Sequence, residues 1–465
     1  MIRNYYFKRD HPSQMKTTAY SILILLIVSL AGCAGFWPFG EEDGFVTVQG
    51  THFVYNNRPY YFIGTNLWYG AYLGAPGPTG NRERLVRELD SLHVLHVNNL
   101  RVLAGSELSI LAHAVSPVFT NAPGRYNNSL LNGLDFLLDE MAKRKMKAVL
   151  YLTNYWEWSG GMSRYIAWTD STRSIDPEKD GWSSYMNFCA SFYTNTKANA
   201  LFHRYIAMLT KRKNTINGRL YADDPTIMAW QLANEPRPGS SMERASSMIP
   251  AFITWVDETA GYIKSLDTNH LVSSGSEGSI GCLERMDVYR SVHESKNIDY
   301  LTFHCWALNW KWYNPLYPDS TLPLSESNAC NYINSHIECA RLLHKPVVME
   351  EFGIGRDSGS FSLSAPTTVR DRYYRRIFSI VYDSARAGSP ISGCNFWAWG
   401  GEGRTTRTDF MWKPGDSFVG DPPQEPQGLN SVFDTDISTL TIIKSFARNM
   451  ERIGAFDSLL SEVRK

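Results

Sequence analysis

The sequence predicts an α/β protein whose strands and helices alternate to form a (β/α)8 TIM barrel with elaborated βα loops. Three observations support this prediction. Short apolar runs recur along the chain, amphipathic helix patterns lie between them, and no glycine-rich phosphate loop follows the first run. A doubly wound open sheet is the alternative fold, but the segment 64–67, Gly-Thr-Asn-Leu, lacks its fingerprint.

The first observation concerns buried strands. Runs of four to eight residues with the composition of such strands are Tyr60–Thr65, Asn98–Leu103, Ala148–Thr153, Ile227–Leu232, Leu271–Ser274, Tyr300–His304, Val347–Glu351 and Gly393–Trp397. Near-continuous apolar strands indicate parallel strands with a covered outer face, and eight such units predict a closed barrel.

The second observation concerns the intervals between these runs, where apolar residues recur at helical spacing. They are Leu85, Val86, Leu89 and Leu92 before the second run, and Leu130, Leu134, Leu137, Leu138 and Met141 before the third. The chain is longer than a bare barrel of about 250 residues. We therefore expect the stretches 155–226 and 400–436 to be elaborated loops that shape a substrate cleft.

The N-terminal residues differ from the rest and have the pattern of an export signal. An apolar run from Tyr20 to Leu30 follows Lys16 and is shorter than the roughly 20 residues that cross a membrane. It ends in Leu-Ala-Gly-Cys33, which resembles a bacterial lipobox and implies that Cys33 is lipidated. Whether the chain starts at Met1 or at Met15 stays open.

The resulting organisation is a signal peptide over 1–33, a short tether over 34–44 and a single catalytic domain over 45–465. We expect an exported monomer that is lipid-anchored to the bacterial cell envelope, at the outer membrane, or else extracellular. Its membrane contact would be through the lipid alone.

Composition excludes several partners and cofactors. Forty-six basic and 46 acidic side chains cancel, so charge indicates no nucleic-acid partner. Neither zinc-ligand spacing nor an HExxH helix is present, so we expect no metal and no cofactor. An exported chain could pair some of its cysteines, for instance Cys330 with Cys339, and the sequence leaves the connectivity open.

Carboxylates end two of the predicted strands, at the barrel face where reactive groups belong. The fourth run, MAWQLANEPR (228–237), brings Asn234 and Glu235 to its end, and the seventh ends in Glu350 and Glu351. Because neighbouring side chains on a strand point to opposite faces, we expect only one of Glu350 and Glu351 to face the axis.

Two carboxylates from different strand ends match the requirements of glycosidic bond cleavage. In the retaining route one protonates the leaving group while the other attacks, at a separation of about 5 to 5.5 Å. The Asn234 amide could bind the sugar 2-hydroxyl, and Arg101 could hold the nucleophile ionised.

Aromatic residues also gather at the strand ends. Eight of the fourteen tryptophans fall there, namely Trp68, Trp156, Trp158, Trp306, Trp310, Trp312, Trp397 and Trp399. Indole rings stack on the apolar faces of sugars, so this placement predicts a polysaccharide cleft, with core packing as the alternative for any one ring.

Together these motifs resemble glycoside hydrolase family five, and within it the endo-β-1,4-mannanase branch. The resemblance runs from Phe45 to Arg452. It is most specific in LRV (100–102), LTNYWEWSGGM (152–162), LANEPR (232–237), SGSEG (274–278), TFHCWALNW (302–310), MEEFG (349–353), NFWAWGGEGR (395–404) and GDPPQEPQGLNSVFDTD (420–436).

The resemblance implies Glu235 as acid/base and Glu351 as nucleophile, with Glu350 structural. It further implies retaining, endo-acting hydrolysis of β-1,4-mannosidic bonds in mannan, glucomannan or galactomannan. A β-1,4-glucanase, an exo-acting β-mannosidase and a non-catalytic glycan-binding protein are the alternatives. The residues expected at the substrate are Arg101, Asn234, His304, Trp397 and Arg237, the last on the leaving-group side, and the strand ends add Trp68, Asn154, Trp156 and Trp306.

One departure from the family concerns Trp306. Many members have a tyrosine at this position, two residues after the histidine, so the hydroxyl that would bond the nucleophile stays unidentified.

Overall fold

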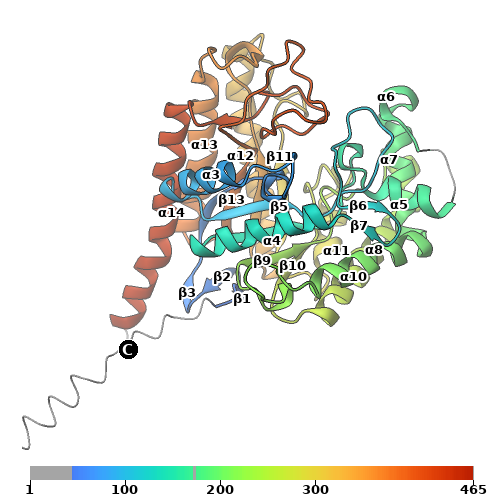
Figure 1. Ribbon diagram of the computed structural model, residues 1–465. Coiled ribbons are helices and arrows are strands. Elements are labelled where there is room, and N and C mark those ends of the chain that lie inside the picture. The colour runs from blue at the N-terminus through green and yellow to red at the C-terminus, as the bar shows by residue number, and fades with distance from the viewer. Residues whose placement is uncertain (1–43, 171–173, 464–465) are drawn as a thin grey trace, which may run out of the picture. The chain divides into compact units, whose positions relative to one another are not determined.

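The computed structural model describes residues 44–170 and 174–463, of which 455–463 are described as backbone only. The predicted signal peptide and Cys33 lie outside the described residues. The compact unit Gly44–Lys465 is built around one parallel sheet of eight strands (Figure 1).

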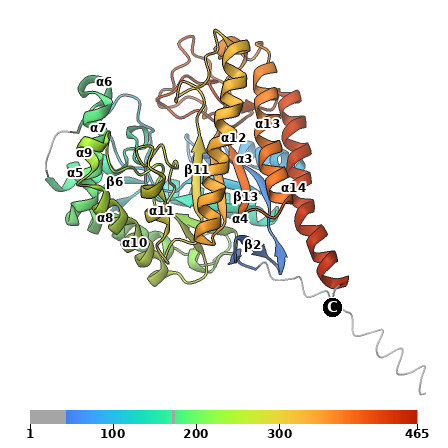
Figure 2. The same cartoon turned by 180° about the vertical axis from the view of Figure 1, so that it is seen from behind.

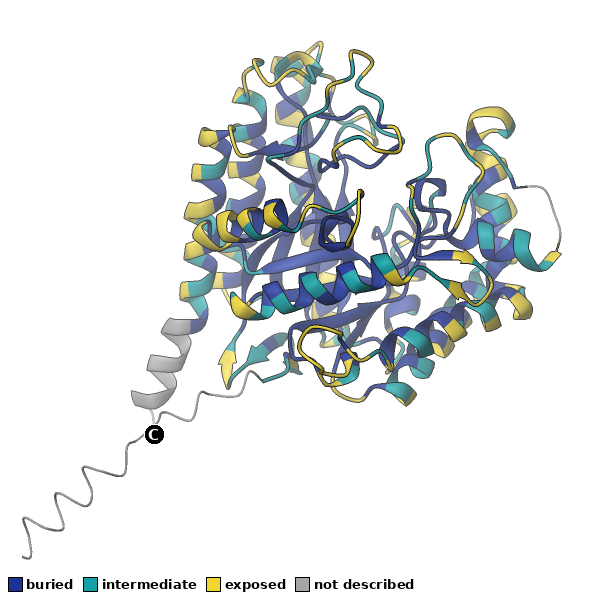
Figure 3. Ribbon diagram, viewed as in Figure 1, coloured by how far each residue is buried: buried dark blue, intermediate teal, exposed yellow. Residues whose placement is uncertain are grey.

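All eight predicted strands are present, with slightly shifted ends. They are β4 (Phe62–Asn66), β5 (Asn99–Leu103), β8 (Lys147–Tyr151), β9 (Ile227–Gln231), β10 (Leu271–Ser273), β11 (Leu301–Cys305), β12 (Val347–Phe352) and β13 (Ile391–Phe396). Every residue in them is buried, as expected for parallel strands covered on both faces (Figure 3).

The strands follow the order β10-β9-β8-β5-β4-β13-β12-β11. Two backbone hydrogen bonds join the ends of this sheet. Asp299 N–H donates to the Val272 carbonyl over 2.9 Å, and His304 N–H donates to the Glu277 carbonyl over 3.1 Å. The predicted (β/α)8 barrel is therefore confirmed, with these contacts bridging the gap between β10 and β11.

The two helices expected from periodicity are also present, as α3 (Arg82–Val94) and α4 (Asn128–Lys143). Each begins at an asparagine, Asn81 or Asn127, whose side chain accepts hydrogen bonds from N–H groups of the first turn. The longer helices that follow are α8 (Thr196–Thr210), α10 (Ile249–Leu266), α11 (Met286–His293), α12 (Pro318–Leu343), α13 (Thr368–Arg386) and α14 (Ile437–Val463). Figure 2 shows α12, α13 and α14 side by side on the outside of the sheet.

The stretch 155–226 is helical, so the expectation of a loop is wrong there. Its elements are η1 (Glu157–Ser159), α5 (Gly161–Asp170), α6 (Pro177–Asp180), α7 (Trp182–Ala190), η2 (Ser191–Thr194), α8 and η3 (Tyr221–Asp223). The physical reason is that this stretch extends the hydrophobic core with aromatic residues, and the rings of Tyr165, Phe192 and Phe202 contact one another.

The stretch 400–436 is mostly irregular, as expected. Its ladder joins β14 (Trp399–Gly401) to β15 (Val432–Phe433). The buried Asp421 carboxylate orders the rest by accepting hydrogen bonds from the N–H groups of Gly428 and Asn430, each over 2.7 Å.

A small antiparallel sheet covers the amino-terminal end of the barrel. It consists of β1 (Thr47–Gln49), β2 (His52–Tyr55) and β3 (Arg58–Pro59). Phe53 of β2 is fully buried against the lower ends of the barrel strands, where its ring contacts Tyr300. The other short elements are α2 (Gly70–Gly74), β6 (Thr120–Ala122), β7 (Arg125–Tyr126), α9 (Met242–Ala245) and η4 (Asp357–Gly359).

The suggested pairing of Cys330 with Cys339 is wrong. Both lie on α12, nine residues apart, and a rise of about 1.5 Å per residue separates them far beyond disulfide reach. The six cysteines in the described part of the chain are all free thiols. None of the described helices is both long enough and apolar enough to cross a bilayer.

Candidate active site

Two glutamates distant in the sequence meet at the carboxyl end of the barrel. Glu235 follows β9 and Glu351 lies at the end of β12. Three atoms lie within 4.8 Å of one another: a carboxyl oxygen of Glu235, a carboxyl oxygen of Glu351 and a ring nitrogen of His304. All three residues are buried. This separation fits direct attack by one carboxylate while the other protonates the leaving group.

The backbone at Glu235 is held in an unusual conformation. Its φ is 52°, a region that non-glycine residues seldom adopt. Its N–H donates to the Gly275 carbonyl over 2.9 Å, and Asn234 N–H donates to the Thr153 carbonyl over 2.9 Å. These hydrogen bonds to the neighbouring strand ends therefore fix the direction in which the Glu235 side chain points.

Arg101 on β5 organises the nucleophile side of the site. Its Nη1 donates to Glu351 Oε1, its Nη2 donates to Asn234 Oδ1 over 2.7 Å, and its Nε donates to Gln231 Oε1 over 2.8 Å. Nη1 also donates to Asn66 Oδ1 over 3.1 Å, so the guanidinium is fixed by four partners, and its charge favours the ionised form of Glu351.

Glu350 also approaches Arg101, which corrects the expectation that it must point away. Its Oε2 lies 3.7 Å from Arg101 Nε and accepts a hydrogen bond from Gln231 over 2.6 Å. The cause is an irregular register, because β12 pairs Met349 and then Glu351 with successive residues of β11 and skips Glu350. A bulge of this kind re-aims side chains next to active sites.

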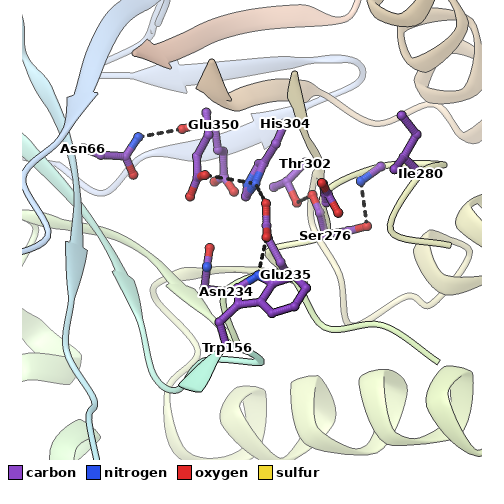
Figure 4. A network of polar contacts seen from close by, with 12 residues as sticks. Asn66, Trp156, Asn234, Glu235, Ser276, Ile280, Thr302, His304 and Glu350 are labelled. Atoms are coloured by element: carbon purple, nitrogen blue, oxygen red, sulfur yellow. Dashed lines mark hydrogen bonds and ion pairs between the residues drawn. The ribbon is translucent and has the colours of Figure 1, made fainter. Parts of the chain in front are cut away.

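The acid side of the site has a different environment. Figure 4 shows Glu235 between His304, whose Nδ1 lies 2.5 Å from Oε1, and Trp156, whose Nε1 donates to Oε2 over 2.5 Å. Burial raises the pKa of Glu235, while the charge of Arg237 and the hydrogen bond from Trp156 oppose that rise. The carboxyl group is thereby favoured in the protonated form that a general acid needs.

His304 contacts both carboxyl groups, since its Nδ1 also lies 3.3 Å from Glu351 Oε2. Burial lowers the pKa of His304 well below its usual range, so the imidazole is neutral. A guanidinium and an imidazole thus contact the nucleophile. Trp306 instead hydrogen-bonds Glu235.

The two carboxyl groups titrate together. Burial raises the pKa of Glu351, opposed by Arg101, and the charge of Glu235 raises it further. Two carboxylates this close resist ionising together. Because Arg101 donates directly to Glu351, the first negative charge resides there and Glu235 keeps its proton.

The same three side chains are a candidate metal-binding group, because Glu235, His304 and Glu351 each offer one ligand atom. The Arg101 guanidinium already forms an ion pair with the Glu351 carboxylate, and its positive charge would repel a metal cation. Two carboxylates suffice for glycosidic cleavage. The arrangement therefore fits acid/base and nucleophilic chemistry better than metal binding.

A cavity of about 490 Å³ opens above the two glutamates. It is lined by Trp156, Glu157, Trp158, Trp182, Asn234, Glu235, Arg237, Glu277, Ile280, Trp306, Asn309, Trp310, Glu351, Trp397, Pro422, Gln424 and Glu425. Five of the strand-end tryptophans therefore face it, as a sugar-binding cleft requires.

Some residues expected at the substrate act elsewhere. Trp68 is 1% exposed and donates Nε1 to the Gly420 carbonyl, so it belongs to the core beneath the loops. Asn154 is fully buried, accepts from Asn234 and donates to Ser159, so it positions Asn234 rather than lining the cavity. Trp399 is also core, and Trp312 lies outside the cavity.

Sequence reasoning missed the partner of Arg237. Glu277 accepts from Arg237 Nη2 and from Trp310 Nε1, and its burial raises its pKa to about 7. The SGSEG segment that follows the fifth strand contains Glu277, so its position after a strand end was the available signal. The pair lies beside the acid and lines the same cavity.

Two further acids in the cavity were missed because they come from the long connections. Glu157 lies in η1 and Glu425 in the stretch 400–436, and burial raises their pKa values to about 7 and about 8. Within the described residues, Oε2 of each has no hydrogen-bond partner. Such unpaired acceptors could bind substrate hydroxyls.

A carboxylate pair at the carboxyl end of a (β/α)8 barrel, under a cavity lined with tryptophan, defines a glycoside hydrolase of the double-displacement type. A family model described as GH family 5 beta-mannosidase-like matches residues 43–455. The chain therefore belongs to the β-mannosidase-like members of glycoside hydrolase family 5.

Relatives with known names agree with this family. Mannan endo-1,4-beta-mannosidase 1 of Arabidopsis thaliana is 31% identical over 77% of this chain and 82% of its own length. The family 5 mannosidase of Rhizomucor miehei is 35% identical, with a TM-score of 0.81 over 90% of this chain and 100% of its own. A point mutant of that mannosidase, 36% identical over 88% of this chain and 98% of its own with a TM-score of 0.81, was solved in complex with mannosyl-fructose.

Proposed function

We propose that this chain hydrolyses internal β-1,4-mannosidic bonds of mannan, glucomannan or galactomannan with retention of anomeric configuration. The observation that carries the proposal is the buried pair Glu235 and Glu351, with oxygens within 4.8 Å and only Glu351 bonded to a guanidinium. The choice of mannose rests on the named relatives, several of which are mannan endo-1,4-beta-mannosidases.

The reaction follows from the two environments. Glu351 attacks the anomeric carbon while Glu235 protonates the departing oxygen, which leaves a glycosyl ester on Glu351. Glu235, now ionised, then takes a proton from a water molecule. The oxygen of that water attacks the anomeric carbon, which releases the sugar and returns Glu351 to its carboxylate form. Arg101 fixes the Asn234 side chain, and the Asn234 amide binds the sugar 2-hydroxyl as the transition state forms; the support is its position next to the acid in the cavity.

Digestion of mannohexaose, monitored by NMR during the first minutes, tests this proposal. We expect the β-anomer to appear first and shorter oligosaccharides to accumulate before mannose. Initial release of the α-anomer would exclude double displacement, and activity confined to carboxymethylcellulose would favour the glucanase alternative.

An exo-acting β-mannosidase is a second candidate, and one feature of the cavity favours it. Glu157 and Glu425 reach the cavity from two different long connections, and the charge of Glu157 raises the pKa of Glu425. Side chains that meet in this way could close one end of the cleft. Mannose as the first and dominant product from mannohexaose would support this candidate.

We further propose that the chain is exported as a monomer and anchored by a lipid on Cys33. The support is the lipobox-like segment that ends at Cys33 after an apolar run. Metabolic labelling with palmitate in a bacterial host should mark the wild type and not Cys33→Ala, which should move from the membrane to the soluble fraction. Equal labelling of both would exclude this anchor.

A further inference from the structure

A second, shallower hollow lies next to the catalytic cavity. It has a volume of about 340 Å³ and is lined by Trp312, Asn328, Asn331, Tyr332 and Ser335. The four residues of α12 have the spacing i, i+3, i+4 and i+7, so they share one face of that helix. We call this hollow the α12 groove.

An aromatic cluster stands between the α12 groove and the cavity and contributes a ring to each. Trp310 lines the cavity, and its ring lies 4.9 Å from that of Trp312 and 5.0 Å from that of Tyr332. Trp310 also donates to Glu277. Because Glu277 also accepts a hydrogen bond from Arg237, the cluster connects the groove to the residues beside the general acid.

The chemistry of the α12 groove fits a neutral carbohydrate. Its lining combines a partly exposed indole, two side-chain amides and a hydroxyl, with no charged group. Within the described residues, the amides of Asn328 and Asn331 make no hydrogen bond to protein, so their donors and acceptors are available. An apolar face flanked by amides matches a sugar ring with its hydroxyls around the edge.

We propose that the α12 groove binds the β-mannan chain beyond the catalytic cavity, with Trp312 stacking on a sugar ring of the leaving-group portion. This inference rests on the proposed function and adds a site to it. The groove would hold the polymer on the enzyme while the bond above Glu235 is cut.

The test compares a polymer with a short substrate. In Trp312→Ala we expect the ratio of kcat/KM on glucomannan to kcat/KM on mannotetraose to fall about tenfold, the loss expected for an aromatic anchor. Trp312→Phe keeps a stacking ring and should recover most of that ratio. Leu316→Ala, an exposed residue on the same connection and outside the groove, should leave the ratio at the wild-type value.

Binding without turnover separates this inference from the proposed function. In a Glu351→Ala background, glucomannan in a native gel should retard the protein, and Trp312→Ala should reduce the retardation. If Trp312→Ala lowers kcat/KM equally on glucomannan and on mannotetraose, Trp312 only holds Trp310 in position. If kcat/KM and the retardation in the gel are both unchanged, the groove binds no glycan. If the wild type cleaves only cellulosic substrates, the mannan function fails, and the retardation of the Glu351→Ala proteins by glucomannan still decides whether the groove binds a glycan.

Discussion

At the scale of single residues, the site assigns different roles to two chemically identical side chains. Glu351 receives a hydrogen bond from Arg101, whereas Glu235 is bonded by Trp156 and approached by neutral His304. Contact with a guanidinium favours a carboxylate, and an apolar setting favours a carboxylic acid. The division of labour therefore follows from environment.

We expect Glu351→Ala and Glu235→Ala each to lower kcat on mannan at least about a thousandfold, because Glu351 forms the glycosyl ester and Glu235 transfers the proton in both steps. Substrates with an activated aryl leaving group should distinguish the two variants. Such a group departs without protonation, so Glu235→Ala should recover much of the first step while Glu351→Ala stays inactive. Stopped-flow release of the aryl group measures this.

Glu350→Gln is the matched control for the nucleophile, since it keeps the shape of a residue that also approaches Arg101. It should retain far more activity than Glu351→Gln. The opposite ranking would reverse the assignment of the nucleophile.

The pH profile should respond to Arg237. Its positive charge lowers the pKa of Glu235, which must stay protonated for the first step. Removing that charge in Arg237→Gln raises this pKa, so the alkaline limb of kcat/KM should move to higher pH. The profile on an unactivated oligosaccharide measures the shift.

Arg87→Gln is the control for this experiment, because Arg87 forms an exposed ion pair with Glu402 on a remote surface. It should leave the alkaline limb in place. A limb that moves to lower pH in Arg237→Gln would contradict the electrostatic role of Arg237.

At the scale of elements, the helical insertion between β8 and β9 is attached to the barrel through Asp135 of α4. The buried Asp135 carboxylate accepts hydrogen bonds from Arg212, Thr215 and Tyr221, all from the end of that insertion. Burial raises the pKa of Asp135, but these hydrogen bonds outweigh it and lower the pKa overall.

Asp135→Asn should lower the free energy of unfolding by about 3 kcal/mol, because it leaves Arg212 without its partner charge. In the wild type the pKa of Asp135 is lower folded than unfolded, so its stabilisation is complete above about pH 4 and is lost as pH falls further. Urea denaturation at pH 7 and at pH 3 should therefore show a smaller difference between variant and wild type at pH 3. An equal difference at both would contradict this linkage.

Regular elements were the most predictable part of the fold. Each barrel strand is mostly apolar because both of its faces are buried, so the eight runs were visible in the sequence. The insertion was not, because rings such as Phe192 pack against partners from neighbouring helices, and no local period encodes those contacts.

The site was predictable to the same extent. Strand ends revealed Glu235 and Glu351, because an abrupt polar residue after an apolar run is a local signal, and Arg101 stood out as a charged residue inside a strand. The approach of Glu350 to Arg101 depends on the register between two strands, and the contribution of Glu425 depends on how a long irregular stretch returns to the cavity. Neither can be read from one segment alone.

At the scale of the whole molecule, the barrel separates stability from chemistry. Reactive side chains occupy the carboxyl end, while the β1–β3 sheet closes the amino-terminal end with Phe53 as its buried centre. Phe53→Ala would open a cavity there, so we expect it to lower the free energy of unfolding by about 3 to 5 kcal/mol. Urea denaturation monitored by tryptophan fluorescence measures the loss.

The same variant should keep the wild-type kcat on mannan below its unfolding transition, because Phe53 lies at the end of the barrel opposite the two glutamates. Phe53→Leu, which leaves a smaller void, should lose less stability and also keep kcat. If kcat falls in proportion to the stability lost while the protein remains folded, the two ends of the barrel are coupled. The rigid strands would then transmit the disturbance at the closed end to the carboxylate pair at the open end.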